Sequence, residues 1–168
     1  MFQKIKQEKK RQFWLAKKVT KKRKTKNKWT VTGDEKKIFA NDYKDQKNVN
    51  AIIRENESPW ILAEYGYNVE RLPENNPTWD KNPDYKINGK IFDNIAPQWD
   101  TPPRNMATYL QKEKFERGQT PWNGVINLWD STRSIDEVLD QFKTWETPWL
   151  KHLLIITKDK QVYELIFE

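Results

Sequence analysis

Apolar side chains return with a helical period in three stretches of the chain. These stretches predict helices over residues 46–65, 105–117 and 134–142. The first contains Pro59, which predicts a kink or a break, and Gly66 follows it as a C-terminal cap. A capping-box pattern, with Ser134 three residues before Glu137, marks the start of the last helix. A further short helix is expected over residues 35–40.

Short apolar or alternating runs between these helices predict strands. They lie over residues 28–32, 67–72, 125–128, 153–157 and 161–167, and in two runs that flank Asn88-Gly89. Asn-Gly is a preferred pair for a two-residue type I′ hairpin turn, and it is the clearest local signal in the chain. The order of elements favours an α/β (α+β) fold in which a central mixed sheet is flanked by helices.

The charge of the chain is concentrated at its beginning. Residues 1–28 hold 13 of the 31 Lys and Arg and one acid, Glu8, whereas the rest has 18 basic and 23 acidic residues. We expect residues 1–28 to be a basic arm, either disordered or helical around Phe13, and residues 29–168 to be a single domain. A cationic arm on a slightly acidic body indicates a polyanionic partner, nucleic acid or an anionic membrane face.

The composition also excludes several kinds of chemistry. The chain has no cysteine, which excludes disulfides, thiolate catalysis and cysteine zinc sites. It has one histidine, His152, which we expect to be structural or exposed. Any catalytic metal must therefore sit mainly on carboxylates, which suit Mg²⁺ or Mn²⁺ and are accepted by Zn²⁺. There is neither an apolar run of membrane-spanning length nor a secretory signal, so a cytoplasmic location without a membrane span is expected.

The predicted hairpin brings two acidic side chains together. If Asn88 and Gly89 form the turn, Tyr85 faces Phe92 and Asp84 faces Asp93. Directly opposed residues have Cβ atoms about 4.5–5.5 Å apart, and like charges there destabilise the pairing. A divalent cation between the two aspartates would remove the repulsion. The alternative is a pair of exposed aspartates that splay into water at the base of an ordinary hairpin.

A third carboxylate and a cation are available on the neighbouring helices. Glu57 is the preferred acid on the first helix. Glu55 remains the alternative, since helical phase does not decide between the two. On the second helix Lys114 continues the stripe of Met106 and Leu110, whereas Lys112 points elsewhere. Lys114 is either a group that stabilises developing charge or a lysine at the edge of the core. Three acids with such a lysine suit phosphodiester hydrolysis.

Several strings of this region resemble a known family. They are ENE, LAEYGYNVE, PDYKINGKIFDNIAP and KFERGQ, and they fall between Asn50 and Leu128, about half of the chain. They resemble the tRNA-cleaving C-terminal toxin domains of CdiA-type contact-dependent growth inhibition proteins. The resemblance implies a PD-(D/E)xK nuclease-like fold, a tRNA substrate, a divalent metal (Zn²⁺ or Mg²⁺) and a cognate immunity protein.

The resemblance also assigns site residues. It implies that Glu57, Asp84 and Asp93 are the metal-binding acids and that Lys114, with Lys112 as the alternative, is the catalytic lysine. The usual (D/E)xK string reads Asp93-Asn94-Ile95 here, so the lysine comes from the following helix.

These observations together predict a metal-dependent endoribonuclease that cleaves tRNA as a bacterial toxin domain, acting in the cytoplasm of the producing or the target cell. The alternatives are a DNA endonuclease of the PD-(D/E)xK type and a nucleic-acid-binding module without catalysis. Two tryptophans in the loops beside the hairpin, Trp79 and Trp99, are candidates for stacking on an unpaired base.

Overall fold

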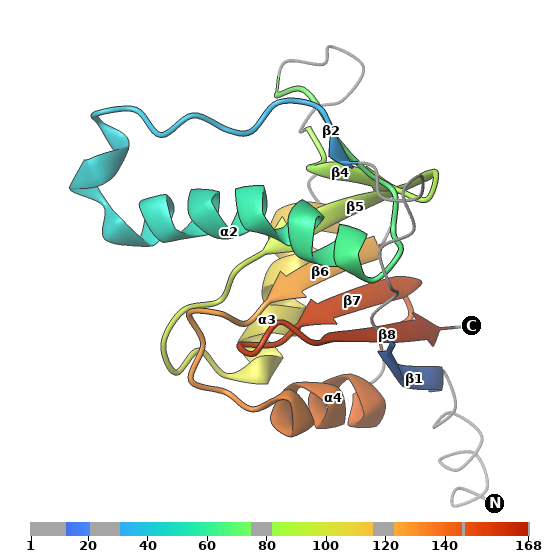
Figure 1. The fold of residues 1–168 in the computed structure, drawn as a ribbon. Coiled ribbons are helices and arrows are strands. Elements are labelled where there is room, and N and C mark those ends of the chain that lie inside the picture. Colours follow the sequence, from blue (N-terminus) through green and yellow to red (C-terminus); the bar gives the residue numbers. More distant parts are fainter. Residues whose placement is uncertain (1–12, 21–30, 75–81, 116–122, 146, 168) are drawn as a thin grey trace, which may run out of the picture.

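The computed structural model describes residues 13–20, 31–74, 82–115, 123–145 and 147–167, and these form one mixed sheet covered by helices (Figure 1). The eight described strands lie in the order β1-β8-β7-β6-β5-β4-β3-β2. Their bounds are Phe13–Val19 (β1), Val31–Thr32 (β2), Val69–Arg71 (β3), Tyr85–Ile87 (β4), Lys90–Ile95 (β5), Asn123–Asn127 (β6), His152–Ile156 (β7) and Val162–Phe167 (β8).

The helices of the described residues are three α-helices, one short 3-10 helix and one π-helical segment. Their bounds are Asp42–Lys44 (η1, the 3-10 helix), Gln46–Glu64 (α2), Pro103–Tyr109 (α3), Leu110–Phe115 (η2, π-helical) and Ile135–Thr144 (α4). None of them combines the length and the apolar character that crossing a membrane requires.

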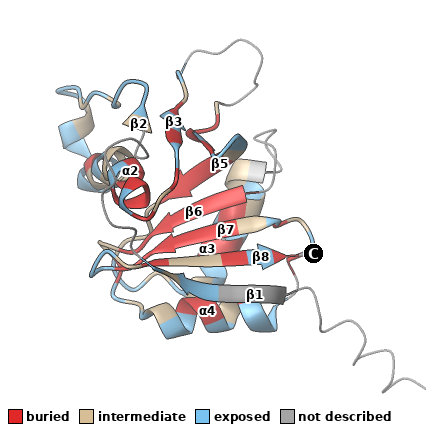
Figure 2. Cartoon of the chain, turned by 45° about the vertical axis from the view of Figure 1, so that its right-hand side comes forward, coloured by how far each residue is buried: buried red, intermediate tan, exposed pale blue. Residues whose placement is uncertain are grey.

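The centre of the sheet is parallel, because β5, β6 and β7 run in one direction. Parallel neighbours need a crossover connection. The connection from β5 to β6 carries α3 and η2, and the connection from β6 to β7 carries α4. All five residues of β6 are buried, as expected for a central strand with both faces covered (Figure 2).

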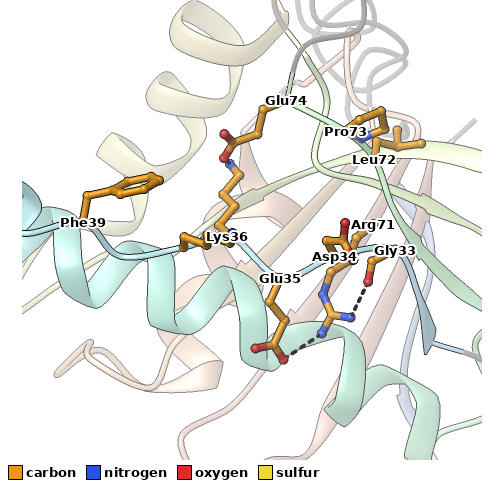
Figure 3. Close-up of a pocket in the computed structure, with 10 residues that line it drawn as sticks. Gly33, Asp34, Glu35, Lys36, Phe39, Arg71, Leu72, Pro73 and Glu74 are labelled. Carbon is orange, nitrogen blue, oxygen red and sulfur yellow. Dashed lines mark hydrogen bonds and ion pairs between the residues drawn. The ribbon is translucent and has the colours of Figure 1, made fainter.

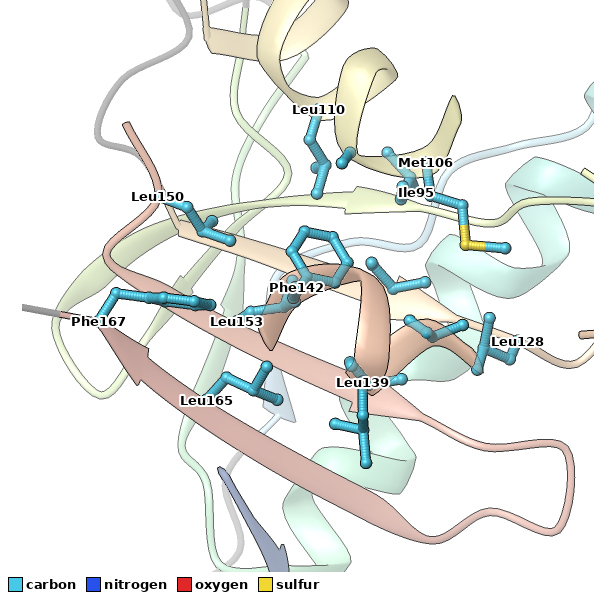
Figure 4. Close-up of a cluster of buried hydrophobic side chains, with 14 residues drawn as sticks. Ile95, Met106, Leu110, Leu128, Leu139, Phe142, Leu150, Leu153, Leu165 and Phe167 are labelled. Atoms are coloured by element: carbon cyan, nitrogen blue, oxygen red, sulfur yellow. The ribbon is translucent and has the colours of Figure 1, made fainter. Parts of the chain in front are cut away.

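Each face of the sheet has its own hydrophobic core. On one face α2 packs through Ile61 and Leu62 against Phe92 of β5 and residues of the neighbouring strands. On the other face α3 and α4 pack through side chains such as Phe142 against Ile95 of β5 (Figure 4). Successive residues of β5 therefore point to opposite layers, so Asp93 lies on the same face as Ile95.

The predicted fold class and the hairpin are confirmed. The sheet is mixed and flanked by helices. Asn88 and Gly89 have φ values of 47° and 84°, as a type I′ turn requires, and Tyr85 pairs with Phe92. The capping box at Ser134 is also present.

Two local predictions were wrong because distant contacts override the local pattern. Residues 13–19 form β1 rather than a helix or a disordered segment, and pair antiparallel with β8, whose edge would otherwise be open. The sheet thus includes part of the predicted arm; the rest of residues 1–28 is outside the described residues apart from Thr20. Residues 35–40 are not helical, because the Asn56 side chain binds both the N–H and the C=O of Lys36. The predicted strand over 28–32 is described only as Val31–Thr32.

The predicted helix after the hairpin begins at Pro103 and changes to π-helix at Leu110. The break expected at Pro59 is not found, since α2 continues to Glu64.

Candidate active site

Two buried aspartates stand where the hairpin meets the rest of the sheet. Asp84 directly precedes β4, and Asp93 lies within β5; their exposed fractions are 6% and 2%. The N–H of Asn94 donates to Asp84 Oδ2 at 2.7 Å, which fixes the Asp84 carboxylate against β5. Burial, and then the charge of Asp84, raise the pKa of Asp93 to about 7. The two aspartates therefore interact, and neither is splayed into water.

The third acid of this group is Glu55 and not Glu57. Lys36 Nζ lies 2.5 Å from Glu55 Oε1 and 3.4 Å from Asp84 Oδ1, so one ammonium group joins the two carboxylates. Burial, followed by the charge of Asp84, raises the pKa of Glu55 to about 8. Glu57 lies elsewhere, with its carboxylate 2.7 Å from Arg54 Nη1 and 3.7 Å from Lys160 Nζ. Glu57 was the preferred acid of the sequence analysis, and the structure brings its alternative to Asp84 instead.

Pro59 helps to explain how Glu55 is placed. Proline has no N–H, so the carbonyl of Glu55, four residues earlier, loses its helical partner. The Tyr85 hydroxyl donates to this carbonyl. The next carbonyl, that of Asn56, accepts from Arg71 Nη2 at 3.0 Å. Side chains of β4 and β3 thus hold α2 at the turn that carries Glu55, and Tyr85 is the chain neighbour of Asp84.

Two lysines approach Asp84 from different parts of the chain. Lys36 Nζ is 3.4 Å from Asp84 Oδ1, and Lys114 Nζ is 3.9 Å from Asp84 Oδ2. Burial alone would lower the pKa of Lys114, but the charges of Asp84 and Asp93 outweigh it and raise that pKa. Lys112, the alternative considered from the sequence, is exposed. Lys114 belongs to η2, and π-helical segments often occur at functional sites.

Lys36 is the residue that the sequence analysis missed. Its ammonium group lies 2.5 Å from Glu55 and 3.9 Å from Glu74, as well as near Asp84. Lys36 lies on an extended segment that runs beside α2. Its side chain points toward Glu74 in Figure 3. Nothing in its local sequence distinguishes Lys36 from other lysines.

Gly33 sets the path of this segment. Its φ is +82°, and a Cβ added there would lie 2.3 Å from the carbonyl oxygen of Arg71. An L side chain at this position would therefore force the segment away from β3. The segment also lines a cavity of about 410 Å³ together with residues that follow β3, among them Arg71 and Glu74 (Figure 3).

The acids suit a divalent cation, although they do not form a complete cage. Asp93 Oδ1 is buried and has no hydrogen-bond partner among the described residues. No three acidic or histidine side chains of the described ranges are arranged to hold a metal ion between them. Mg²⁺ is commonly bound through one or two carboxylates, with waters and substrate phosphates as the other ligands. Asp84 and Asp93 fit such a site better than a closed three-acid site.

A second cavity, of about 350 Å³, opens beside these groups. Glu55 and Lys114 belong to its lining, and α3 contributes Asn105, Met106 and Tyr109. The carboxylates therefore have space beside them for part of a substrate.

His152 lies outside this group, as expected. It begins β7, and its Nε2 is 3.6 Å from Glu164 Oε1, while its ring meets Phe92 edge-on with centroids 5.2 Å apart. Glu164 also accepts a hydrogen bond from the Tyr67 hydroxyl. Trp99 is exposed, and Trp79 is outside the described residues.

Comparisons with known proteins agree with one another. Residues 81–162 match the family described as the contact-dependent growth inhibition CdiA C-terminal domain. The chain is 40% identical over 114 residues, 68% of its length, to the tRNA nuclease CdiA-2 of Burkholderia pseudomallei (strain 1026b), and this stretch spans 4% of that protein. The solved CdiA-CT/CdiI toxin and immunity complex from Burkholderia pseudomallei contains a chain that is 34% identical, with a TM-score of 0.70. The match covers 82% of the present chain and 98% of that one.

Proposed function

Because the chain belongs to the family of contact-dependent growth inhibition CdiA C-terminal domains, we propose that it is a toxin domain that cleaves tRNA. The observation that carries this proposal is a buried group of three acids and two lysines. Its members are Glu55, Asp84, Asp93, Lys36 and Lys114. Such a group provides both negative ligands and positive charge, which phosphodiester hydrolysis requires. The name of the curated relative supports tRNA as the substrate.

The reaction is metal-dependent, and the site is a variant of the PD-(D/E)xK type. Asp84 and Asp93 would hold the divalent ion, Mg²⁺ or Zn²⁺. When bound, such an ion polarises a phosphate oxygen and lowers the pKa of its water. The buried, unpartnered Oδ1 of Asp93 supports this assignment.

The remaining groups act on the phosphate and on the acids. Lys114 offers its ammonium group to the charge that develops on the phosphate in the transition state. Glu55 shares the Lys36 ammonium group with Asp84 and thereby helps to orient it. Lys36 offsets the negative charge of Glu55 and Asp84 from the α2 side.

Basic residues outside the site supply affinity for the RNA backbone. The described part of the basic segment includes Lys17 and Lys18, which are exposed on β1. Contacts of this kind weaken steeply as salt rises, because counterions are released from the nucleic acid on binding.

The chain also has a cognate immunity protein as a partner and acts in the cytoplasm of the target bacterium. The solved relative, a complex of a toxin with its immunity protein, supports the first statement.

A direct assay tests the proposed function. The full chain is incubated with total tRNA, with duplex DNA and with either Mg²⁺, Zn²⁺ or a chelator. Cleavage of tRNA that needs the metal and is lost in Asp84→Asn is the expected result. Cleavage of DNA but not of tRNA would show that the substrate is DNA. Binding of tRNA without cleavage under every metal condition would show that the chain is a binding module without catalysis.

A further inference from the structure

The cavity between α2, β5 and α3 is built differently from the carboxylate group that it adjoins. Its lining combines apolar side chains such as Ile95 and Met106 with polar ones, and Glu55 and Lys114 belong both to this lining and to the group around Asp84. Its volume of about 350 Å³ lies in the range of pockets that bind small organic groups. A substrate whose phosphate reaches Lys114 would therefore place a neighbouring apolar or aromatic group in this cavity.

Two side chains of α3 line this cavity and are themselves exposed. Asn105 and Tyr109 lie four residues apart, so they occupy one face of the helix. Tyr109 is 50% exposed, although large aromatic side chains usually bury most of their surface. Neither side chain forms a hydrogen bond within the part of the chain that the structure describes. Tyr109 lines the same cavity as Lys114.

We infer that this cavity holds one unpaired nucleobase of the RNA, next to the phosphate that is cut. Proteins recognise unpaired RNA bases by stacking them on aromatic rings and by hydrogen bonds to their edges. Tyr109 provides the ring, and the Asn105 amide provides both a donor and an acceptor for the edge of the base. A base and its own phosphate belong to one nucleotide, which agrees with a cavity that shares Lys114 with the catalytic group.

This inference changes the stacking residue expected from the sequence. Trp99 is 65% exposed but is not among the residues that line the cavity. Tyr109 lines the cavity together with Lys114, so we assign the stacking role to Tyr109. The inference rests on the proposed RNA substrate, and its test separates the two.

The first part of the test compares Tyr109→Leu with Tyr109→Phe in the full chain. Loss of a stacked base typically weakens binding by roughly 5- to 150-fold. We expect Tyr109→Leu to lower kcat/KM for tRNA by a factor in this range, mainly through KM, and Tyr109→Phe to stay within about twofold of the wild type. Tyr43→Leu, which removes a second exposed tyrosine that is not among the residues lining the cavity, is the matched control and should leave kcat/KM unchanged.

The second part removes the base instead of the ring. RNA hairpins that carry the preferred cut site are made with an abasic ribose at each nucleotide that flanks the cut. At one of these positions, removing the base should lower kcat/KM of the wild type by about the same factor as Tyr109→Leu does on the intact hairpin. Removing that base should not lower kcat/KM of Tyr109→Leu any further. Equal cleavage by Tyr109→Leu and the wild type, or two losses that multiply, would overturn the base pocket while leaving the nuclease proposal intact.

A binding measurement completes the separation. The same hairpins are titrated into Asp84→Asn, with and without Tyr109→Leu, and fluorescence anisotropy reports affinity without any cleavage. If the pocket binds the base, Tyr109→Leu should weaken binding of the hairpin with all its bases. The same substitution should leave the affinity for the abasic hairpin unchanged. Equal affinities for the intact hairpin would contradict the pocket, whether or not the wild type cleaves tRNA.

Discussion

The core beneath α3 and α4 and the acidic site share strand β5, but the core buries apolar side chains and the site buries charged ones. Ile95 enters the core, where apolar side chains such as Phe142 and Leu153 fill the space between sheet and helices (Figure 4). Asp93, on the same face and two residues earlier, is a buried carboxylate with an unpartnered oxygen. In the core apolar side chains are buried among apolar side chains, whereas the site buries carboxylates.

The backbone shows the same contrast. Helix α4 begins with a complete capping box at Ser134, as its sequence predicts. The elements that carry the site are irregular, because α2 contains Pro59 and Lys114 lies in the π-helical η2. Departures from local preference tend to gather at functional sites. If the acidic group is the catalytic site, as proposed, stability is concentrated in one region and reactivity in the other, and mutations should separate them.

The largest effect on stability is expected from the core. Phe142→Ala should lower the free energy of unfolding by roughly 3–5 kcal/mol, since it removes a fully buried ring and leaves a cavity. Denaturant unfolding measures this change. The rate of tRNA cleavage per folded molecule should stay close to that of the wild type; a large loss there would mean that the core also shapes the site.

The largest effect on activity is expected from the lysine of η2. Lys114→Met should lower kcat for tRNA cleavage by about 10²–10³-fold, the usual result of removing one group that stabilises a transition-state charge. Single-turnover kinetics on tRNA measure it. Lys112→Met, at an exposed neighbour on the same segment, is the control; an equal loss in both variants would contradict the assignment.

A smaller effect should touch both regions at once. Tyr85→Phe leaves the Glu55 carbonyl without its donor, which should cost about 1–3 kcal/mol of stability and several-fold in cleavage. Tyr67→Phe removes a comparable hydroxyl that binds Glu164 on the same face of the sheet. It should lower stability without lowering the cleavage rate. Thermal unfolding and cleavage assays on both variants show whether Tyr85 acts through Glu55.

A further expected effect is a change of stability with pH. The pKa values of Glu55 and Asp93 are raised, to about 8 and about 7, so the unfolded chain releases these protons at lower pH than the folded chain. In the metal-free protein, stability should therefore fall as pH rises from about 4 toward 8. Asp93→Asn should flatten the part of this slope below about pH 7. Unfolding curves at several pH values measure the slope, and an identical profile in the variant would count against a strained Asp93.

The parts of the site that follow from local chemistry could be predicted from the sequence. Asn88-Gly89 determines the turn and the pairing of β4 with β5, and this pairing brings Asp84 and Asp93 together. The helical stripe of Met106 and Leu110 identified Lys114 rather than Lys112, and the structure has Lys114 beside Asp84. These signals extend over only a few residues, so they can be read without knowing the tertiary structure.

The other parts depend on contacts between distant residues. Glu55 and Glu57 are equivalent in helical phase, and what distinguishes them is the hold that Tyr85 has on the Glu55 carbonyl, 30 residues away in sequence. Lys36 reaches the site because Asn56 binds its backbone across 20 residues. Strand β1 likewise depends on the open edge of β8. A local pattern contains none of this information.

The pairing of β1 with β8 also has a consequence for how the chain reaches its native state. It joins Phe13 to Phe167, residues near opposite ends of the described chain. Closing so long a loop is slow, because its entropy is lost before the new contacts form. Until β1 docks, β8 presents unpaired backbone groups to other chains. A delay in this pairing would expose the edge of β8 to self-association, and the exposed Lys17 and Lys18 on β1 disfavour pairing of the completed edge with another sheet.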